Sequence, residues 1–211
     1  MLLGRRLSDR NRLHEIWLPP LNEELEFVDC YGVHPEPNER IEVCLPAQVW
    51  TSQISQAIRS GFLITIDYGY TRNQQLTGRH HGTLMAYRHH SAGPDPYQAP
   101  GEQDLTAHVN FTAISAACEQ AGMKVEKLLT QSQFLMGIGE KNHFAEAFEN
   151  CRLPQERAKV ALQIKHLLTP EGMGENFQVL IGSRNVEEKK LVGLGGLTFG
   201  KTSRLSVPGS Q

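Results

Sequence analysis

Apolar and polar stretches alternate along the chain in a way that predicts helices and strands in turn. Within residues 45–61 apolar residues recur at helical spacing, and Pro46 suits a first turn while Gly61 suits a C-cap. Residues 62–69 are β-forming and apolar on both faces, which is typical of an interior strand of a parallel sheet covered by helices. A helix, a glycine, a buried strand and a polar loop make one half-turn of a doubly wound α/β fold.

The region before this helix has a weaker pattern. Residues 12–30 hold two short extended segments around a Pro-Pro pair, which predicts a hairpin or strand pair near the N-terminus. Proline weakens the hydrogen-bond ladder of the first of these strands. Residues 34–44 follow as a loop that enters a short strand with Ile41 and Val43 on one face.

A long polar stretch, residues 70–107, separates the strand from the next helix. A loop longer than about 15 residues in a compact domain is usually functional or disordered. The helix that follows is predicted to be capped by Asn110 or Thr106 and to end at Gly122.

The last third of the chain predicts a strand, helical segments and a final strand. The strand covers residues 124–135, the helical region 144–168 is divided by Pro154, and the final strand covers 175–185. The tail, residues 187–211, is charged and then rich in Gly and Ser, and we expect it to be flexible. This order resembles the second half of an open α/β sheet.

Composition narrows the class of protein. The 211 residues include 21 basic and 23 acidic side chains, a net charge of −2, which gives no electrostatic argument for a nucleic-acid partner. The four cysteines are scattered without a C-x-x-C pair, which favours reduced thiols in a cytoplasmic protein. No stretch approaches the roughly 20 apolar residues of a membrane-spanning helix. We therefore expect a cytoplasmic chain with no membrane span.

The end of the strand at 62–69 is the first candidate site. Ligands of open α/β sheets bind beyond the carboxyl ends of the strands. Asp67 at this place could accept a substrate proton, orient a cation or cap the next segment. Tyr68 and Gly69 fit the same place, because glycine permits a positive φ or a close approach of a ligand.

Two histidine pairs, His80-His81 and His89-His90, follow this strand and suggest a metal site. Adjacent histidines in a strand point to opposite faces, so one pair cannot place both rings on one ion. Zinc needs three or four ligands in a tetrahedral array, so we predict no metal site here. A histidine that acts as a base or hydrogen-bond partner, and solvated loop histidines, both stay open.

The segment "PGEQDLT", residues 100–106, precedes the second helix and has two interpretations. It could form a turn whose charge interacts favourably with the helix dipole. Alternatively, Asp104 and Thr106 could face the same cleft as Asp67. The glycine-rich "GLGGLTFG" lies in the tail and not between a strand and a helix, so it does not predict a nucleotide-binding turn.

Four motifs, in order and spacing, resemble a known family: "LITIDYG", "HGTLMAYRHH", "PGEQDLTAHVNFTAI" and "TQSQFLMGIG". They are similar to the later half of the MidA-like S-adenosylmethionine-dependent methyltransferases. That family includes the mitochondrial enzyme that methylates an arginine of a complex I subunit during assembly. The resemblance covers roughly residues 12–182. It implies an α/β fold, the C-terminal part of a Rossmann-like class I methyltransferase sheet with helices on both faces, plus the strand pair near the N-terminus.

The resemblance also implies site residues, because this chain keeps most letters of the D-Y-G, H-G-T-L-x-x-Y-x-x-H and P-G-x-x-D-L-T-x-x-V-D-F motifs. At Asn110 the family pattern usually has aspartate, which puts a catalytic role of that position in doubt. The expected catalytic residues are Asp67, His81, His90 and Asp104. The expected substrate-binding residues are Tyr68, Gly69, Thr83, Tyr87 and Thr106.

The family's nucleotide-binding half, with its glycine-rich turn, has no counterpart in this sequence. We therefore expect residues 1–186 to be the C-terminal part of a methyltransferase domain, and 187–211 to be its tail. The implied cofactor is S-adenosyl-L-methionine. The implied partner is a protein substrate such as a respiratory complex I subunit or its bacterial counterpart, with a mitochondrial matrix location in a eukaryote. Arginine methylation by the intact form and a non-catalytic or partner-dependent module without cofactor binding are the two functional hypotheses.

Overall fold

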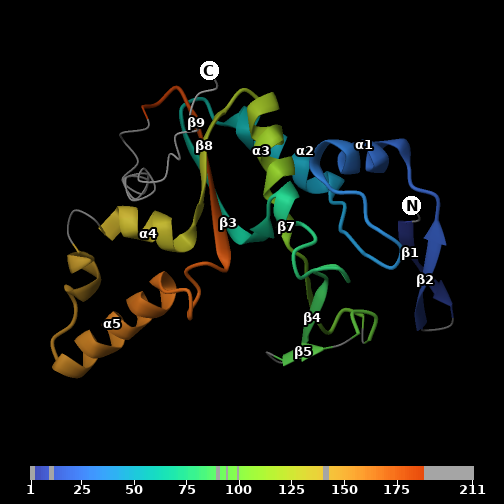
Figure 1. Cartoon of the computed structure of the whole chain (residues 1–211). Helices are drawn as coiled ribbons and strands as arrows, with labels where there is room; N and C mark the ends of the chain where they lie inside the picture. Colours follow the sequence, from blue (N-terminus) through green and yellow to red (C-terminus); the bar gives the residue numbers. More distant parts are fainter. Residues whose placement is uncertain are drawn as a thin grey trace, which may run out of the picture. The chain divides into compact units, whose positions relative to one another are not determined.

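The computed structural model describes residues 3–9, 12–88, 91–93, 95–98, 100–139 and 143–187, with side chains described from Glu15 onward (Figure 1). The chain divides into two compact units. The first contains residues 1–57 and 68–122, and the second contains 58–67 and 123–211. The strand β3 (Gly61–Tyr70) runs from the second unit into the first.

The described residues of the first unit form short strands and three helices. Besides the end of β3, its elements are β1 (Leu3–Asp9), β2 (Arg12–Leu18), α1 (Asn22–Tyr31), α2 (Leu45–Ala57), the 3₁₀ turn η1 (Arg72–Gln74), β4 (Met85–Arg88), β5 (Ser91–Gly93), β6 (Asp104–Thr106), β7 (Val109–Asn110) and α3 (Phe111–Gln120). The long polar stretch, residues 70–107, is therefore not a simple loop, since its described residues contain three strands, β4, β5 and β6. Each has only three or four residues, too few for an alternating pattern to predict it.

A strand pair does lie at the N-terminus, but the partner of the first predicted strand differs from the prediction. β1 and β2 pair antiparallel from Leu3 opposite Leu18 to Asp9 opposite Arg12. The second predicted extended segment is instead the helix α1. Phe27 and Val28 are adjacent and both buried, which a strand with one solvent-facing side would not produce.

The predicted helix and strand around Gly61 are confirmed, although α2 ends at Ala57 and Gly61 begins β3. The predicted strand at residues 41 and 43 is wrong. An isolated bridge joins Arg40 to His81, and the side chain of Glu42 contacts a turn, as described below.

α3 and α2 pack together in the core of the first unit. Asn110 is the N-cap of α3 as predicted, and its Oδ1 accepts a hydrogen bond of 3.1 Å from the backbone N–H of Ala113. Ser55 in α2 donates to the sulfur of Cys118 in α3 at 3.8 Å, and both side chains are fully buried. Burial raises the pKa of the Cys118 thiol, so this cysteine is a neutral core residue. Cys151 is only half-buried.

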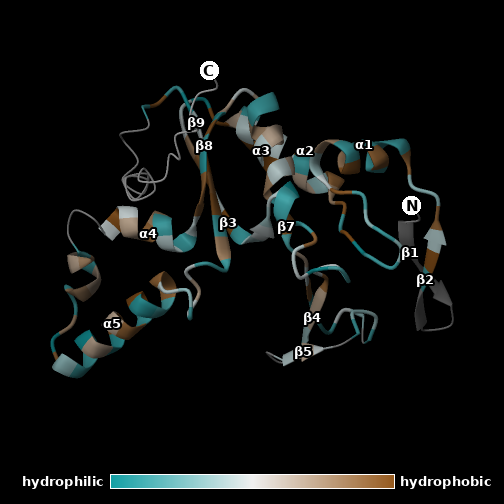
Figure 2. Ribbon diagram, viewed as in Figure 1, coloured by the Kyte–Doolittle hydropathy of each residue, from teal (hydrophilic) through white to brown (hydrophobic). Residues whose placement is uncertain are grey.

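The second unit contains the first part of β3 with β8 (Lys124–Thr130), α4 (Gln131–Gly139), η2 (Ala145–Phe148), α5 (Pro154–Leu168) and β9 (Phe177–Arg184). The hydrogen-bonded strand order in this unit is β3-β9-β8, and β8 and β9 are antiparallel. The core contains Leu129, Phe134, Val179 and Ile181, against which Phe62 and Leu135 pack. Figure 2 shows hydrophobic, brown-coloured positions along the strands of this sheet.

The predicted strand over residues 124–135 ends at Thr130, and α4 follows directly. Thr130 and Gln133 cap each other: the Thr130 N–H donates to the Gln133 side chain at 3.0 Å, and the Gln133 N–H donates to the Thr130 hydroxyl at 3.3 Å. This T-x-x-Q arrangement is a capping box, a start signal for a helix that is visible in the sequence. The two helical pieces around Pro154 and the last strand are confirmed as η2, α5 and β9.

β3 is not buried on both faces as the sequence predicts. Ile64 and Ile66 expose 39% and 48% of their surface, whereas Gly69 and Tyr70 are buried. The two-residue strand β7 pairs in parallel with Gly69 and Tyr70, and with no earlier residue of β3. The sheet is therefore mixed, with parallel and antiparallel pairs.

Two sequence expectations concern membranes and the tail. Among the described residues, no helix combines the length and the apolar character needed to cross a membrane. The predicted flexible tail, beyond Glu187, lies outside the described residues.

Candidate functional site

The carboxyl end of β3 is where predicted motif residues contact other side chains of the first unit. Gly69 lies so close to β7 and α3 that an added Cβ would overlap the Val109 carbonyl oxygen and the Phe111 ring. Only glycine lets these backbones approach at this place. The glycine of the D-Y-G motif is therefore required by packing, because it allows the end of β3 to contact the start of α3.

Three rings lie beside this strand end. The rings of Tyr68 and His108 are stacked, with centroids 6.2 Å apart and an interplanar angle of 18°. The Tyr70 ring lies 6.4 Å from His108 at 40°. Tyr68 exposes 40% of its surface, while Tyr70 is almost completely buried. Tyr68 can therefore meet a ligand, and Tyr70 supports the arrangement from within.

Arg79 connects two of these rings. Its Nε donates to Nδ1 of His108 at 3.3 Å, and its guanidinium lies 5.8 Å from the centre of the Tyr70 ring. Its Nη1 also donates to the carbonyl oxygens of Gln74 and Thr77, each at 3.0 Å. The bond to Nδ1 makes that nitrogen an acceptor, so the neutral imidazole of His108 carries its proton on Nε2.

Tyr70 is a neutral side chain at physiological pH. Burial, followed by the negative charge of Glu42, raises the pKa of Tyr70 to about 12. Its hydroxyl accepts a long hydrogen bond of 3.5 Å from Nε2 of the buried Gln75. Tyr70 thus serves as a wall of the site and not as a base.

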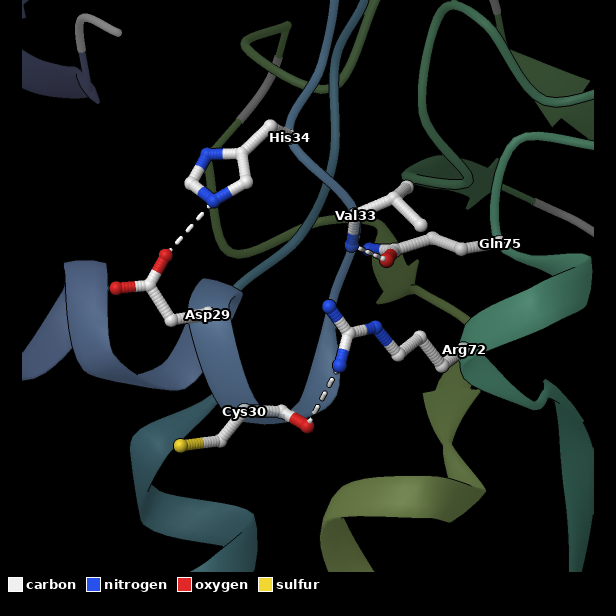
Figure 3. A network of polar contacts seen from close by, with 6 residues as sticks. All are labelled: Asp29, Cys30, Val33, His34, Arg72 and Gln75. Carbon is white, nitrogen blue, oxygen red and sulfur yellow. Dashed lines mark hydrogen bonds and ion pairs between the residues drawn. The ribbon is translucent and has the colours of Figure 1, made fainter.

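The chain that follows β3 is tied to α1 and the loop after it, as Figure 3 shows. The guanidinium of Arg72 donates to the Cys30 carbonyl oxygen at 3.3 Å, and Oε1 of Gln75 accepts from the Val33 N–H at 2.9 Å. His34 and Asp29 form an exposed pair at 2.7 Å beside them. Since Gln75 also contacts Tyr70, these hydrogen bonds help to fix the position of the carboxyl end of β3.

A turn at Gly82–Leu84 completes this part of the site. Oε1 of Glu42 accepts the N–H groups of Thr83 at 2.6 Å and Leu84 at 3.2 Å. The Thr83 hydroxyl in turn accepts the backbone N–H of His108 at 2.9 Å. Thr83, which the motif predicts as a site residue, is therefore connected with His108 and so with Tyr68.

A second group of predicted residues lies on the small sheet. In β4 and β6, Tyr87 is directly opposite Asp104, and Met85 is opposite Thr106. Residues two apart in a strand share a face, so these four side chains project from the same face. All four are exposed. Tyr87, Asp104 and Thr106 are thus brought together, as a second cluster of predicted site residues.

Asp67, His81 and His90 are the remaining predicted residues. Asp67 is exposed and belongs to the part of β3 in the second unit. His81 is exposed and forms the backbone bridge with Arg40. His90 lies outside the described residues.

Sequence reasoning missed three residues of this site: Glu42, Arg79 and His108. His108 occupies a position that the motif leaves unspecified, although it lies between two motif residues. Glu42 is about 40 residues from the turn it contacts, and no local pattern connects the two. Glu42, Arg79 and His108 belong to the site because they contact its other residues in the folded chain, and not because of a sequence motif.

The described residues contain no group of three or more His, Cys, Asp or Glu side chains arranged to hold a metal ion. His80 bonds Glu39 at 2.6 Å. A backbone N–H from Glu36, followed by the His80 ring, lowers the pKa of Glu39. His89 and His90 lie outside the described residues.

The first unit also has a groove of about 480 Å³ among α1, α2 and α3. Its lining includes Glu23, Glu26 and Phe27 of α1 and several glutamine side chains of α2 and α3. None of the predicted site residues lines it. The site at the end of β3 is therefore defined by its contacts and not by this groove.

Comparison with known proteins now identifies the family. Residues 5–129, more than half of the chain, match the family described as "Putative S-adenosyl-L-methionine-dependent methyltransferase". The chain belongs to this family of S-adenosyl-L-methionine-dependent methyltransferases, and S-adenosyl-L-methionine is the cofactor of the family. The resemblance predicted from the four motifs is confirmed.

Among curated proteins, the chain is similar to the mitochondrial protein arginine methyltransferase NDUFAF7. It is 28% identical to the human protein over 171 residues, which cover 75% of this chain and 36% of the relative. It is 30% identical to the zebrafish (Danio rerio) protein over 147 residues, 68% of this chain and 32% of the relative. The chain therefore spans about a third of the length of these curated relatives.

Two solved structures from Burkholderia thailandensis share the fold. One is an uncharacterized protein, with a TM-score of 0.76 and 27% identity over 90% of this chain and 51% of that chain. The other belongs to the same superfamily and was solved with S-adenosyl-homocysteine bound, with a TM-score of 0.75, 26% identity and coverage of 90% and 49%. These likenesses confirm the predicted α/β, Rossmann-like methyltransferase fold.

The described residues do not by themselves fit the whole cofactor. A Rossmann-type site needs a glycine-rich turn between a strand and a helix, where backbone N–H groups approach the ligand. Here β3 leads through Thr71 into η1, β7 leads through Asn110 into α3, and β8 leads through Thr130 directly into α4. None of these described junctions is glycine-rich.

Proposed function

We propose that this chain takes part in methylation of protein arginine with S-adenosyl-L-methionine as the methyl donor. Its family membership and its similarity to proteins named protein arginine methyltransferase support this acceptor. The observation that carries the proposal is the stack of Tyr68 on His108 at the carboxyl end of β3. An exposed tyrosine face, backed by a second ring, is suited to a planar guanidinium group.

The acceptor side of the reaction has clear chemical needs. Methyl transfer is an in-line displacement, and alignment of the reactants can contribute roughly 7–11 kcal/mol. An arginine nucleophile must also lose a proton, so a carboxylate or a histidine is needed beside it. In this proposal Asp67, His81, His90 and Asp104 are the proton-accepting candidates. Of the two clusters seen in the structure, Asp104 contributes to the one with Tyr87 and Thr106.

We further propose that residues 1–186 form the C-terminal part of a methyltransferase domain, and that most of the cofactor site is supplied by chain outside the printed sequence. Two findings support this: the solved relatives are about twice as long as the matched region, and no described strand end has a glycine-rich turn. The proposed substrate is a protein, such as a respiratory complex I subunit or its bacterial counterpart. The proposed location is the cytoplasm, or the mitochondrial matrix in a eukaryote.

A non-catalytic, partner-dependent module is the second candidate function. Ile64 and Ile66 of β3 are exposed, and β7 pairs only with the last two residues of this strand. Both observations favour a partner protein that packs beside β3. In this case the chain by itself would neither bind the cofactor nor transfer a methyl group.

One experiment separates the two candidates. The chain is purified from its own cells with an affinity tag, so that any companion segment is retained, and titrated with S-adenosyl-L-methionine. Methylated arginine is then measured in acceptor proteins by mass spectrometry. We expect cofactor binding and arginine methylation, and a loss of about 10²-fold in transfer for Tyr68→Ala. The matched control, Leu162→Ala on the exposed face of α5, should keep wild-type transfer.

Transfer to lysine or to no residue, despite cofactor binding, would contradict the proposed acceptor. Absence of cofactor binding in the purified material would favour the non-catalytic module.

A further inference from the structure

We propose that Glu42 is a positioning residue that clamps the turn Gly82–Leu84. Through Thr83, this clamp fixes His108 against the ring of Tyr68. The inference rests on the proposed function, in which the stacked rings form part of the acceptor side. It assigns a role to a residue outside all four sequence motifs.

The carboxylate of Glu42 is the fixed point of the clamp. Its Oε1 accepts two consecutive backbone N–H groups, from Thr83 at 2.6 Å and Leu84 at 3.2 Å. Hydrogen bonds to an ionised acceptor are about twice as strong as neutral ones. Glu42 is half-buried, so these donors replace part of the water that its charge would otherwise bind.

The turn has the shape that this contact requires. Gly82 has φ +83°, a left-handed conformation that side chains other than glycine rarely adopt. A Cβ at this position would also lie only 2.6 Å from Oε1 of Glu42. The glycine of the H-G-T-L motif therefore makes room for a carboxylate that comes from a distant segment.

Thr83 transmits the clamp to the next motif. Its N–H is held by Glu42, and its hydroxyl accepts the backbone N–H of His108 at 2.9 Å. Thr83 exposes only 8% of its surface, so neither bond competes freely with water. One buried residue thus joins the segment of Glu42 to the segment of His108.

His108 is where the clamp reaches the proposed site. Its ring is stacked on Tyr68 and receives the Nε–H of Arg79. A backbone shift at His108 would move its ring with respect to both neighbours. A displacement of about 1 Å in a positioning group can cost about 10²-fold in rate. The clamp therefore affects the geometry of the acceptor side without touching the substrate.

Amide hydrogen exchange tests the clamp independently of catalysis. In Glu42→Ala we expect the amides of Thr83 and Leu84 to exchange at least about tenfold faster, because a bond to a charged acceptor is lost. Glu42→Gln, which keeps an acceptor oxygen, should show a smaller increase. The matched control is Glu36→Gln, the same substitution at an exposed position of the same segment. Amides of β9 should keep wild-type rates in all variants.

Wild-type exchange of both amides in Glu42→Ala would overturn the proposal. If Glu42→Ala unfolds and every amide exchanges faster, two variants of Thr83 test the clamp instead. Thr83→Val has nearly the same shape but no hydroxyl, while Thr83→Ser keeps the hydroxyl. Faster exchange of the His108 amide in the valine variant alone supports the clamp, and equal rates in both variants overturn it.

Measurement of kcat and KM for methyl transfer tests whether the clamp contributes to catalysis. With the methyl-transfer assay described above, we expect Glu42→Ala, which removes the acceptor oxygen, to lower kcat about tenfold with KM changed less than about twofold, as for a lost alignment. Wild-type kcat in this variant would overturn the positioning role. If the wild-type protein transfers no methyl group, the proposed function fails, and the exchange measurements alone decide whether Glu42 holds the turn.

Discussion

The two parts of β3 differ in how they are covered, and the more apolar first part is the more exposed one. Ile64 and Ile66 are exposed in the first part, whereas Gly69 and Tyr70 are buried in the last part. β7 runs beside the last two residues only, and α3 begins immediately after β7. Apolar sequence therefore makes a strand, but a neighbouring element is needed to bury it. The predictions below test this difference.

The largest effect is expected at Gly69. In Gly69→Ala the new Cβ would overlap the Val109 carbonyl oxygen and the Phe111 ring, so β3 and β7 must separate. We expect a loss of about 3 kcal/mol in the free energy of unfolding, measured by urea denaturation. Gly93→Ala is the control, since its Cβ would meet only ordinary contacts. Equal losses in the two variants would show that Gly69 has no special packing role.

The second effect concerns the buried phenol of Tyr70. Its pKa is raised from 10.0 to about 12 in the folded protein, so the folded state keeps a proton that the unfolded state loses. Stability is therefore fully present below pH 10 and falls as the pH rises toward 12, by about 2–3 kcal/mol. Urea denaturation at several pH values should show this fall in the wild-type protein and a smaller one in Tyr70→Phe. Parallel curves for the two proteins would contradict the assignment.

The third effect tests the junction between β7 and α3. Asn110→Ala removes the N-cap bond to Ala113 and the bond from Nδ2 to the Tyr31 carbonyl oxygen, which is 2.9 Å long. We expect a loss of about 1–2 kcal/mol in the free energy of unfolding. Asn110→Ser keeps a capping oxygen and should lose less. If the serine variant is as unstable as the alanine variant, the cap contributes little.

The smallest effect is expected in the exposed part of β3. Ile66→Val should change the free energy of unfolding by less than about 0.5 kcal/mol, because a surface methylene leaves no cavity. The same substitution at the fully buried Ile181 of β9 should cost about 1 kcal/mol. Thermal or urea unfolding of both variants makes the comparison. A cost at Ile66 as large as that at Ile181 would mean that a further element covers this face in solution.

Local patterns predicted several elements of the fold. α2, α3 with its Asn110 cap, α5 after Pro154 and the strands β3 and β9 have strong periodicity or clear caps. α1 was misread because its apolar residues alternate only partly. α4 was missed although Thr130 and Gln133 form a recognisable capping box. The strands of the small sheet were missed because they are too short to show a period.

The candidate site was predictable only in part. The motifs identified Tyr68, Gly69 and Thr83, which contacts within the first unit do connect. They also identified Tyr87 and Asp104, which pair across two strands. Nothing in the local sequence indicated that His108 or Glu42 would join the first group.

By itself, the sequence determined the family, through the order and spacing of four motifs, and several of the helices and strands, through local periodicity and capping. The tertiary structure alone decided which face of β3 is covered, why Gly69 and Gly82 must be glycines, and which side chains support Tyr68. The physical reason is the range of the interactions. Helix caps and periodic faces act within a few residues, whereas the contacts of Glu42 with the turn at 82–84 join segments about 40 residues apart and exist only once the chain has folded.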